Sequence, residues 1–261
     1  MNKKVELYVN STKPKAMLLS KKIEEELISQ GYEIVKEEAD IVIGLGGDGT
    51  LLTLLRERNY NITSKYIGVN CGTLGFLQDF EVENVENFVR NISNYVEKDL
   101  SFLKICVRKD NEVHEFNALN EVMVQDGEDK AFRTNVYIEN EFLEKFVGTG
   151  IIFSTSTGST AMNLSAGGAI IHSGLEVIQM TPREAIANSK MHCLPKSICI
   201  PKEMDISLWP NASDKIKIYA DGACVYCGEY DKVQVYYSDK YMTKLQKEES
   251  NFIKTIREKL I

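Results

Sequence analysis

The chain has 261 residues, of which 43% are apolar and 26% are charged, and its net charge is −7 at pH 7. This length suffices for one large domain or two modest ones, and the composition is typical of a globular protein. The acidic balance argues against nucleic acid as a main partner, because nucleic-acid interfaces need a basic surface.

We expect no targeting or membrane segment in this sequence. No apolar run approaches the ~20 residues that span a bilayer. Glu6, Asn10 and Lys13 interrupt any apolar signal core near the N-terminus. We therefore expect no membrane partner and a cytoplasmic location.

The six cysteines are scattered along the chain, as Cys71, Cys106, Cys193, Cys199, Cys224 and Cys227. Without a signal segment they are expected to be free thiols rather than disulfides. Cys224 and Cys227 form a CxxC pair, but neither a second pair nor a nearby histidine completes a zinc site. We expect no metal held by protein ligands there.

The first part of the chain alternates strands with helices. Apolar patterns predict strands at residues 5–9, 32–35, 41–45 and 66–70. Helical spacing predicts helices at residues 14–30, directly after the glycine turn at 46–49, and at 82–96. This alternation favours a parallel sheet covered by helices, in which ligands bind at the carboxyl ends of the strands.

From about residue 98 the apolar pattern changes to strand after strand. Alternating residues predict antiparallel strands over 102–124 and 135–147, and further strands at 151–153, 197–200, 206–209, 216–219, 224–226 and 233–237. Residues 244–261 are charged with one apolar face, which predicts a final helix. We therefore predict an α/β domain at 1–97 followed by a β-rich domain at 98–243.

The turn Gly46-Gly47-Asp48-Gly49 lies between a predicted buried strand and a predicted helix. This layout points backbone N–H groups and a positive helix end at a phosphate, and glycine permits positive φ and close approach of a ligand. The turn lacks the Lys-Ser or Lys-Thr ending of a P-loop. Asp48 stands instead where phosphate would bind, and a carboxylate there is repulsive unless it binds a metal or takes a proton. Asp48 is therefore a candidate catalytic residue.

A second polar stretch follows the strand at 151–153. Its six hydroxyl residues are Ser154, Thr155, Ser156, Thr157, Ser159 and Thr160. One hydroxyl would cap the helix that follows, so the surplus suits a ligand rich in hydroxyls or phosphates. Ala161 and the nearby glycines would let a flat base lie against the backbone. Asn120-Glu121, at a strand end, is weaker evidence, because a polar strand face in water explains it equally well.

Taken together, these segments resemble the NAD kinases. The resemblance rests on Gly46-Gly47-Asp48-Gly49-Thr50, Asn70-Cys71-Gly72-Thr73-Leu74-Gly75-Phe76-Leu77, Asn120-Glu121 and residues 154–168, which occur in the family's order and spacing. Phosphofructokinases and diacylglycerol or sphingosine kinases resemble the first motif alone, whereas the combination is much more specific.

The resemblance implies transfer of a phosphoryl group from ATP to the adenosine-ribose 2′-hydroxyl of NAD, giving NADP. It also implies a Rossmann-like three-layer α/β domain with a parallel sheet, joined by the C-terminal helix at 244–261. The second domain would be a sandwich-like all-β domain that binds NAD, with the site in the cleft between the two domains. The resemblance further implies a divalent metal such as Mg²⁺ and a homodimer or homotetramer.

The family's motifs assign roles to individual positions. Asp48 would be the catalytic carboxylate that acts on the 2′-hydroxyl. Phosphate would lie against Gly46, Gly47 and Gly49, and ribose hydroxyls or metal against Asn120 and Glu121. The remaining substrate contacts implied for this chain are Thr149, Thr157, Thr160, Ala161, Met162 and Ser165.

The sequence departs from the family pattern around the dinucleotide. Family members usually carry aspartate where Thr149 stands, proline at Ser156, tyrosine at Met162, and small apolar residues at Arg183 and Glu184. The glycine turn is intact, so we predict an NAD kinase with an altered substrate end. Two alternatives stay open: a kinase for another hydroxyl acceptor, such as a lipid or nucleotide, and a non-catalytic NAD(P)-binding regulator.

Overall fold

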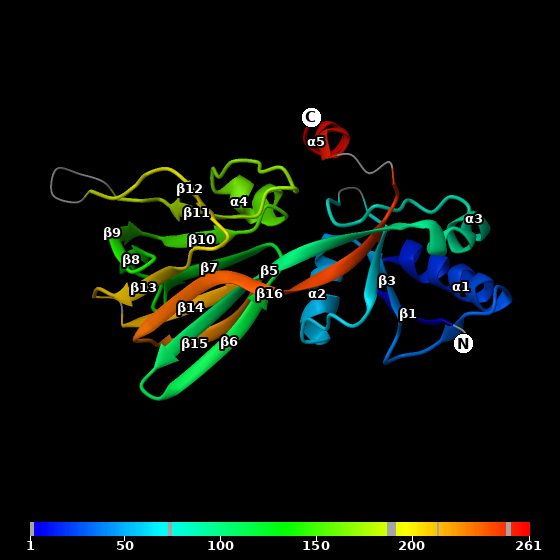
Figure 1. The fold of residues 1–261 in the computed structure, drawn as a ribbon, viewed down its shortest axis with the longest axis horizontal. Helices are drawn as coiled ribbons and strands as arrows, with labels where there is room; N and C mark the ends of the chain where they lie inside the picture. Colours follow the sequence, from blue (N-terminus) through cyan, green and yellow to red (C-terminus); the bar gives the residue numbers. More distant parts are fainter. Residues whose placement is uncertain (1–2, 73–74, 187–191, 213, 249–251) are drawn as a thin grey trace. The chain divides into compact units, whose positions relative to one another are not determined.

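The structure, a computed structural model, describes residues 3–72, 75–186, 192–212, 214–248 and 252–261. The chain divides into two compact units (Figure 1). Unit 1 comprises Met1–Leu100 and Tyr241–Ile261, and unit 2 comprises Ser101–Lys240. The long strands β5 (Val96–Lys109) and β16 (Lys232–Gln246) each contribute residues to both units.

Unit 1 is built on four parallel strands in the order β2-β1-β3-β4, namely Glu33–Ile34, Lys4–Val9, Ile41–Gly46 and Lys65–Asn70. Strand β16 adds to β4 in parallel, with Thr243 opposite Lys65. Helix α1 (Pro14–Ser29) connects β1 to β2, and helix α2 (Asp48–Glu57) connects β3 to β4. The first connection runs toward one edge of the sheet and the second toward the other edge. Because such crossovers are right-handed, the two helices lie on opposite faces of the sheet.

The side chains of β3 show the two faces directly. Ile43 and Leu45 belong to one core cluster with Ile23 and Leu27 of α1. On the alternate face, Gly44 lies against the leucine side chains of α2. This is the period-2 pattern of a strand buried on both sides. The predicted three-layer α/β arrangement is confirmed.

The direction of the chain connections reverses between β1 and β3. In a doubly wound sheet a crevice forms at that point, outside the carboxyl ends of the two strands. Here those ends are Val9 of β1 and Gly46 of β3. The glycine turn therefore follows the strand at the position where this topology binds ligands.

Unit 2 is a sandwich of two sheets. One contains β5 and β16 with β6 (Glu112–Ala118), β13 (Ile206–Pro210), β8 (Phe132–Ile138) and β9 (Glu141–Gly148). The other is antiparallel, in the order β12-β11-β10-β7-β14-β15, namely Ile198–Pro201, Val177–Arg183, Gly150–Ser154, Glu121–Asp126, Lys215–Ala220 and Ala223–Glu229. The predicted all-β, sandwich-like domain is confirmed.

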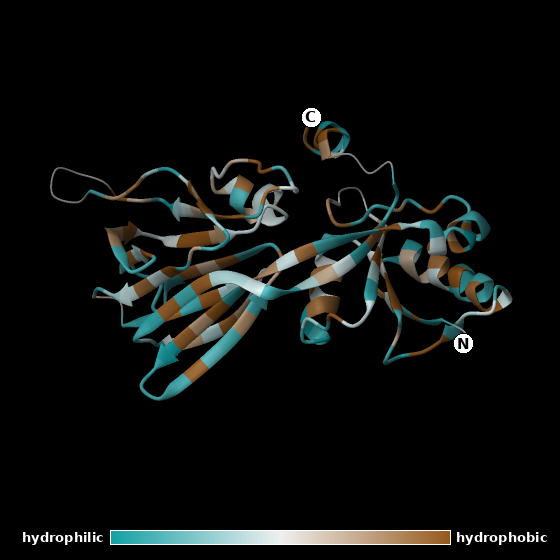
Figure 2. Ribbon diagram, viewed as in Figure 1, coloured by the Kyte–Doolittle hydropathy of each residue, from teal (hydrophilic) through white to brown (hydrophobic). Residues whose placement is uncertain are grey.

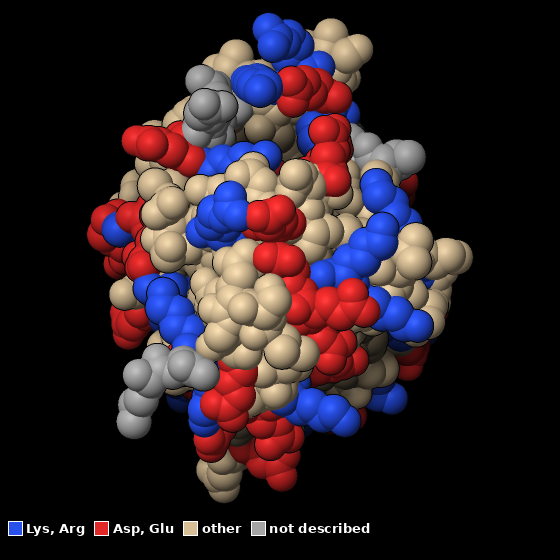
Figure 3. Space-filling model, turned by 90° about the vertical axis from the view of Figure 1, so that its right-hand side faces the viewer, with Lys and Arg blue, Asp and Glu red and all other residues tan. Residues whose placement is uncertain are grey.

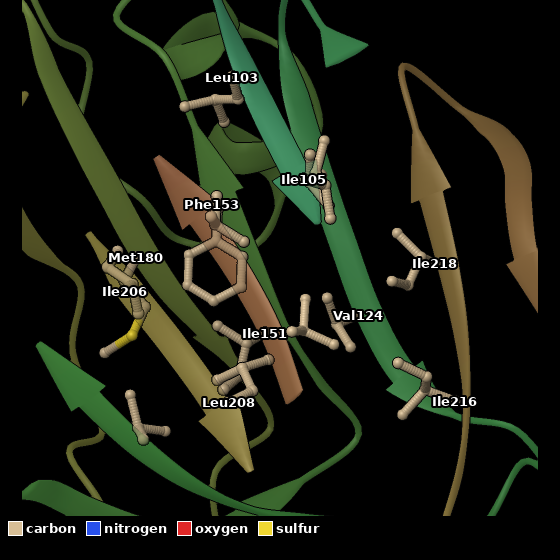
Figure 4. Packing of buried hydrophobic residues seen from close by; sticks show 14 of the residues in the cluster. Leu103, Ile105, Val124, Ile151, Phe153, Met180, Ile206, Leu208, Ile216 and Ile218 are labelled. Atoms are coloured by element: carbon tan, nitrogen blue, oxygen red, sulfur yellow. The ribbon is translucent and has the colours of Figure 1, made fainter. Parts of the chain in front are cut away.

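Buried apolar side chains from both sheets fill the sandwich core. Leu208 of β13 and Ile105 of β5 come from one sheet, and Phe153 of β10 and Ile218 of β14 from the other (Figure 4). Along these strands hydrophobic and hydrophilic residues alternate, as Figure 2 shows by colour. The alternation buries one face of each sheet and leaves the other polar.

Three sequence-based element predictions need correction. The helix predicted at 82–96 is shorter, with α3 at Val85–Arg90 and a 3₁₀ turn at Ile92–Asn94, because β5 begins at Val96. The helix predicted from residue 244 begins later, since β16 continues to Gln246 and α5 spans Phe252–Leu260. Strand β11 was not predicted, and its end carries Pro182, a residue that weakens strand patterns.

No helix among the described residues is long and apolar enough to cross a membrane. On the face drawn in Figure 3, basic and acidic side chains are interspersed rather than gathered by sign.

Candidate functional site

Asp48 is the first residue of α2, directly after the turn that ends β3. One of its carboxylate oxygens accepts the backbone N–H of Phe76 at 2.6 Å, and the other accepts the N–H of Leu77 at 3.0 Å. The Gln78 side chain donates to the Gly47 carbonyl at 2.9 Å, so three hydrogen bonds tie the segment after residue 75 to the turn. The carboxylate is thus held in one orientation by backbone groups. Thr73 and Leu74, from the same predicted motif, lie outside the described residues.

Burial raises the pKa of Asp48. The two backbone N–H donors, and then the charges of Lys244 and Lys259, oppose this rise without cancelling it. The N-terminus of α2 also favours the ionised form, because helix N-termini attract negative charge. A carboxylate whose pKa is raised binds a proton more strongly than an ordinary aspartate, which suits a general base.

A cavity of ≈ 220 Å³ adjoins the segment that holds Asp48. It is lined by Gly75, Phe76, Gln78, Asp79, Glu81, Lys247, Lys254, Thr255, Glu258 and Lys259. The lining mixes both charge signs. Unit 1 therefore has a small cavity beside the segment whose backbone N–H groups hold Asp48, although Asp48 itself does not line it.

Space rather than conformation explains why the turn has glycine at position 46. The described glycines with positive φ are Gly31, Gly167 and Gly222, so the positive φ that we expected in the turn is wrong. A Cβ on Gly46 would lie 2.0 Å from Thr50 Oγ1, whereas a Cβ on Gly49 would meet nothing within 4 Å. Packing therefore explains Gly46. It does not explain Gly49, where open space remains for a ligand.

Lys13 is a residue of this site that the sequence analysis missed. It precedes α1 at the carboxyl end of β1. A Cβ placed on Gly72 would lie 2.7 Å from Lys13 Nζ, and one on Gly47 would lie 3.4 Å from it. Among the described residues no carboxylate forms an ion pair with it. An ammonium group therefore lies over the glycine turn, with no carboxylate of the described chain paired to it.

The link between β1 and the turn is also polar. Thr50 Oγ1 accepts the Gly47 N–H and the side-chain amide of Asn10, each at 3.2 Å. Asn10 directly follows β1. The side chain of Thr50 thus ties together the two strand ends that form the crevice. The available sequence signal for Asn10 and Lys13 was only their position after a predicted strand.

In unit 2, Asn120 and Glu121 lie at the start of β7 and are buried, with 6% and 5% of their surfaces exposed. Glu121 is directly opposite Ser154 of β10. Asn120 Oδ1, Glu121 Oε2 and Ser154 Oγ have no hydrogen-bond partner in the described part of the protein. A buried polar atom without a partner costs about 1–3 kcal/mol, so this cluster is suited to a ligand with hydroxyl groups.

Burial, and after it the neighbouring charge of Asp221, raises the pKa of Glu121 to about 8. A backbone hydrogen bond from Met162 acts in the opposite direction. Glu121 therefore carries a proton at neutral pH in the free protein. Its carboxyl group can donate as well as accept a hydrogen bond.

The hydroxyl-rich turn packs directly on the Asn120 backbone. Gly158 allows this, since a Cβ there would lie 2.0 Å from the Asn120 carbonyl oxygen. The hydroxyl of Thr155 donates to the Leu119 carbonyl at 2.7 Å, and that of Ser159 to the Ser156 carbonyl at 2.7 Å. Much of the hydroxyl surplus thus stabilises the turn itself, whereas we expected the hydroxyls beyond one helix cap to suit a ligand.

The residues of this stretch that we predicted to contact substrate are the accessible ones. The side chains that are partly or fully exposed to solvent include Thr157, Thr160, Ala161, Met162 and Ser165. They flank the 3₁₀ turn at Gly158–Thr160 and the short helix α4 at Met162–Ser165. The structure brings this stretch next to Asn120 and Glu121, because Gly158 packs on the Asn120 backbone and the Met162 N–H donates to Glu121.

Thr149 lies apart from this cluster. It precedes β10, whereas Ser154 ends that strand, about 16 Å away at ~3.3 Å per residue. Its hydroxyl donates to the Arg183 carbonyl at 3.3 Å. Thr149, Arg183 and Glu184 instead line a separate cavity of ≈ 210 Å³. The departures from the family pattern at these three positions are therefore gathered at one place.

The described residues contain no group of three or more His, Cys, Asp or Glu side chains that could hold a metal ion. Cys224 and Cys227 are free and exposed on β15. In the glycine turn, Asp48 has the carboxylate that could bind a cation accompanying a phosphate ligand.

Comparisons with known proteins decide the family. The model of the ATP-NAD kinase N-terminal domain matches residues 2–99, and that of the ATP-NAD kinase C-terminal domain matches residues 119–246. The chain belongs to the ATP-NAD kinase family.

Similar proteins agree with this membership. An NAD kinase of Finegoldia magna is 32% identical over 255 residues, covering 94% of this chain and 93% of its own length. One of Campylobacter lari is 31% identical over 253 residues, covering 94% of this chain and 88% of its own. The resemblance predicted from the motifs is confirmed.

Solved structures show the same fold. A yeast NADH kinase complexed with NADH has a TM-score of 0.86 at 19% identity, covering 98% of this chain and 86% of its own. An NAD kinase from Archaeoglobus fulgidus in complex with ATP has a TM-score of 0.78 at 20% identity and 99% coverage of both chains.

Proposed function

We propose that the protein transfers the γ-phosphoryl group of ATP to the adenosine-ribose 2′-hydroxyl of NAD, giving NADP. This is the activity of the ATP-NAD kinase family, a group of phosphotransferases with an alcohol acceptor. One observation carries the proposal for this chain: a half-buried carboxylate, Asp48, is fixed by two backbone N–H groups within the glycine turn at the carboxyl end of β3.

The proposed role of Asp48 is that of the general base. A sugar hydroxyl is a weak nucleophile, and a base within hydrogen-bond reach accelerates its attack about 10²–10⁴-fold. As the oxygen attacks the γ-phosphorus, its proton passes to the carboxylate of Asp48, and the bond from phosphorus to the leaving ADP oxygen breaks. Such a reaction depends mainly on positioning and charge neutralisation.

The phosphates are proposed to lie against Gly46, Gly47 and Gly49, with Lys13 supplying positive charge. The open space beside Gly49 and the ammonium group over Gly47 support this assignment. Lys13 would also screen the phosphate charge from Asp48, which removes the repulsion that a carboxylate in this turn otherwise creates.

The dinucleotide is proposed to bind the accessible residues of unit 2. Its ribose hydroxyls would pair with the free oxygens of Asn120 and Glu121, and its base would lie against Ala161 and Met162. Thr157, Thr160 and Ser165 would supply neutral hydroxyl donors. The unpaired buried oxygens support this arrangement, because a ligand hydroxyl would satisfy them.

A divalent metal, with Mg²⁺ as the candidate, is part of the proposal as a companion of ATP. Mg²⁺ usually binds substrate phosphates together with one or two carboxylates, and Asp48 fits that need where no larger ligand group is present among the described residues. When bound, the ion would neutralise phosphate charge during transfer. A cytoplasmic location and a homodimer or homotetramer also belong to the proposal.

The proposal is tested by incubating the purified protein with NAD, ATP and Mg²⁺ and measuring NADP. A panel of other acceptors, including NADH, a free nucleoside and a diacylglycerol, addresses the alternative of another hydroxyl substrate. NADP formation that exceeds phosphorylation of every other acceptor is expected. NAD that binds but is not converted with any donor or metal would instead indicate a regulator.

Thr149 can be tested by Thr149→Asp, which restores the carboxylate usual in the family. We expect tighter NAD binding, because a carboxylate accepts hydrogen bonds from ligand amino or hydroxyl groups more strongly than a hydroxyl does. Isothermal titration with NAD measures this, with Thr63→Asp, at an exposed position before β4, as control. An unchanged dissociation constant would show that Thr149 does not occupy the place of a ligand-contacting acid.

A further inference from the structure

The carboxylate of Asp221 is buried against the Asn120-Glu121 strand end. Only 8% of the residue's surface is exposed. Its oxygens accept the backbone N–H groups of Leu119 at 2.8 Å, Asn120 at 2.8 Å and Glu121 at 3.3 Å. Its own N–H donates to the Glu121 carbonyl at 3.0 Å. Four hydrogen bonds therefore join one residue to a strand end about a hundred positions earlier in the chain.

The local turn does not require this carboxylate. Asp221 and Gly222 form the tight turn between β14 and β15, and both have positive φ, at 47° and 78°. Such two-residue turns favour Asn-Gly as strongly as Asp-Gly. The side chain's bonds to β7 are thus additional to the turn. An ionised carboxylate suits three N–H donors, because it only accepts hydrogen bonds.

We propose that Asp221 is a positioning residue, whose carboxylate fixes the backbone of Leu119, Asn120 and Glu121 and so sets the place of the two side chains that meet the dinucleotide. This inference rests on the proposed function, since it assumes that Asn120 and Glu121 bind NAD. Asp221 itself lies behind the strand end and acts through these neighbours. The fixed backbone leaves Asn120 Oδ1 and Glu121 Oε2 free for ligand hydroxyls.

The charge of Asp221 gives this role a signature that simple structural support lacks. Among the described residues, Ser154 of β10 lies opposite Glu121, and the groups that shift its pKa besides burial are Asp221, which follows β14, and the Met162 N–H of α4; of these Asp221 carries a charge. Its negative charge helps to keep the pKa of Glu121 raised, so that Glu121 meets the ligand as a protonated donor. Removing the charge should therefore move the pH at which Glu121 ionises downward.

The test compares Asp221→Asn with the wild-type protein. The variant would retain a favoured Asn-Gly turn. Its side-chain NH₂ group would face one of the three backbone N–H donors without accepting from it, and the side chain would carry no charge. The control, Asp231→Asn, removes a carboxylate that also accepts a backbone N–H, from Asp110 at 2.7 Å, at another hairpin of unit 2. NAD binding by the full chain is measured by titration calorimetry from about pH 6 to about pH 10, together with steady-state NADP formation.

We expect Asp221→Asn to raise the KM for NAD about 10- to 100-fold, the effect of losing a charge-assisted hydrogen bond, with a smaller change in kcat. Wild-type NAD binding should weaken above about pH 8, and this transition should move to lower pH in the variant. In a Glu121→Gln background, which is neutral at every pH, Asp221→Asn should no longer move any transition. Asp231→Asn should match the wild type.

Two outcomes separate the claims. If the wild type makes NADP while Asp221→Asn keeps the wild-type KM and the wild-type pH transition, the role of Asp221 is disproved and the proposed function stands. If the wild type neither binds nor phosphorylates NAD, the proposed function fails. Should Asp221→Asn unfold, the pH dependence of NAD binding is compared between the wild type and Glu121→Gln. Loss of the transition near pH 8 in Glu121→Gln would show that a protonated Glu121 meets the ligand, and its persistence would disprove this.

Discussion

Asp48 satisfies two opposing requirements. Burial raises its pKa and strengthens it as a base, while the N–H groups of Phe76 and Leu77 keep its carboxylate in place and restrain the rise. The residue type and the motif pointed to Asp48 from the sequence alone. The backbone donors could not be predicted, because they come from a segment 28 and 29 positions later whose path only the fold defines.

Lys13 shows the limit of motif-based prediction for single residues. A lysine after a strand has no signature, and its meaning arises only because β1 and β3 are neighbours in the parallel sheet. Asp221 is similar: the sequence Asp-Gly predicts a tight turn, whereas its three bonds to β7 follow from the pairing of β7 with β14.

We predict that Lys13→Met raises the KM for ATP about tenfold, the cost of losing one charge-assisted contact to phosphate. The thermal stability should change little, because no described carboxylate pairs with this lysine. Steady-state kinetics with varied ATP measure the effect, and Lys21→Met, an exposed position on α1, serves as control. An unchanged KM for ATP would remove Lys13 from the phosphate site.

Among the elements, the turn between β3 and α2 was predicted correctly in its layout and wrongly in its conformational reason. An apolar strand, a glycine turn and a helix are local patterns, so the sequence defines them well. The need for glycine at position 46 arises from the Thr50 side chain, which folds back over the turn to meet Gly47 and Asn10.

Gly46→Ala and Gly49→Ala form a matched pair that separates packing from binding. Gly46→Ala should lower the free energy of unfolding by about 1–3 kcal/mol, because its Cβ would overlap Thr50. Gly49→Ala should leave stability equal or slightly higher, since alanine favours a helix over glycine by ~1 kcal/mol, while weakening ATP binding. Denaturant unfolding and ATP titration measure the two effects. Normal ATP binding by Gly49→Ala would show that no phosphate approaches this residue.

Element boundaries were less predictable than element types. The charged segment from residue 244 has helical spacing, yet Lys244 is buried in β16, where it pairs with Asp79 at 2.6 Å. An ion pair with a residue far away in sequence thus overrides the local pattern. The unpredicted β11 similarly gains its place from pairing with β10 and β12 rather than from its own alternation.

For the molecule as a whole, two periodicities predicted the parallel α/β sheet and a β-rich second domain, whereas the sandwich was implied by the family resemblance. The boundaries between the two units were harder to predict, because β5 and β16 each contribute residues to both units and no loop marks the boundary. The predicted boundaries at 97–98 and 243–244 fall inside these strands.

Glu121 makes global stability depend on pH. Its pKa is about 8 in the folded protein and near 4.5 without burial, so the folded state holds a proton that the unfolded state releases in this range. The free energy of unfolding should therefore decrease as pH rises from about 4.5 to about 8. Urea unfolding at several pH values measures this decrease, which Glu121→Gln should reduce. Equal slopes in both proteins would contradict a protonated Glu121.

The central claim, that Asp48 is the base for phosphoryl transfer to NAD, is tested most directly by Asp48→Asn. The matched control is Asp40→Asn, whose carboxylate also accepts a backbone N–H, from Lys4 at 2.8 Å, just before β3 begins. NADP formation and NAD affinity are measured for each variant. We predict that Asp48→Asn lowers kcat about 10²–10⁴-fold while the NAD dissociation constant stays at the wild-type value. NADP formation at the wild-type rate by Asp48→Asn would contradict the account.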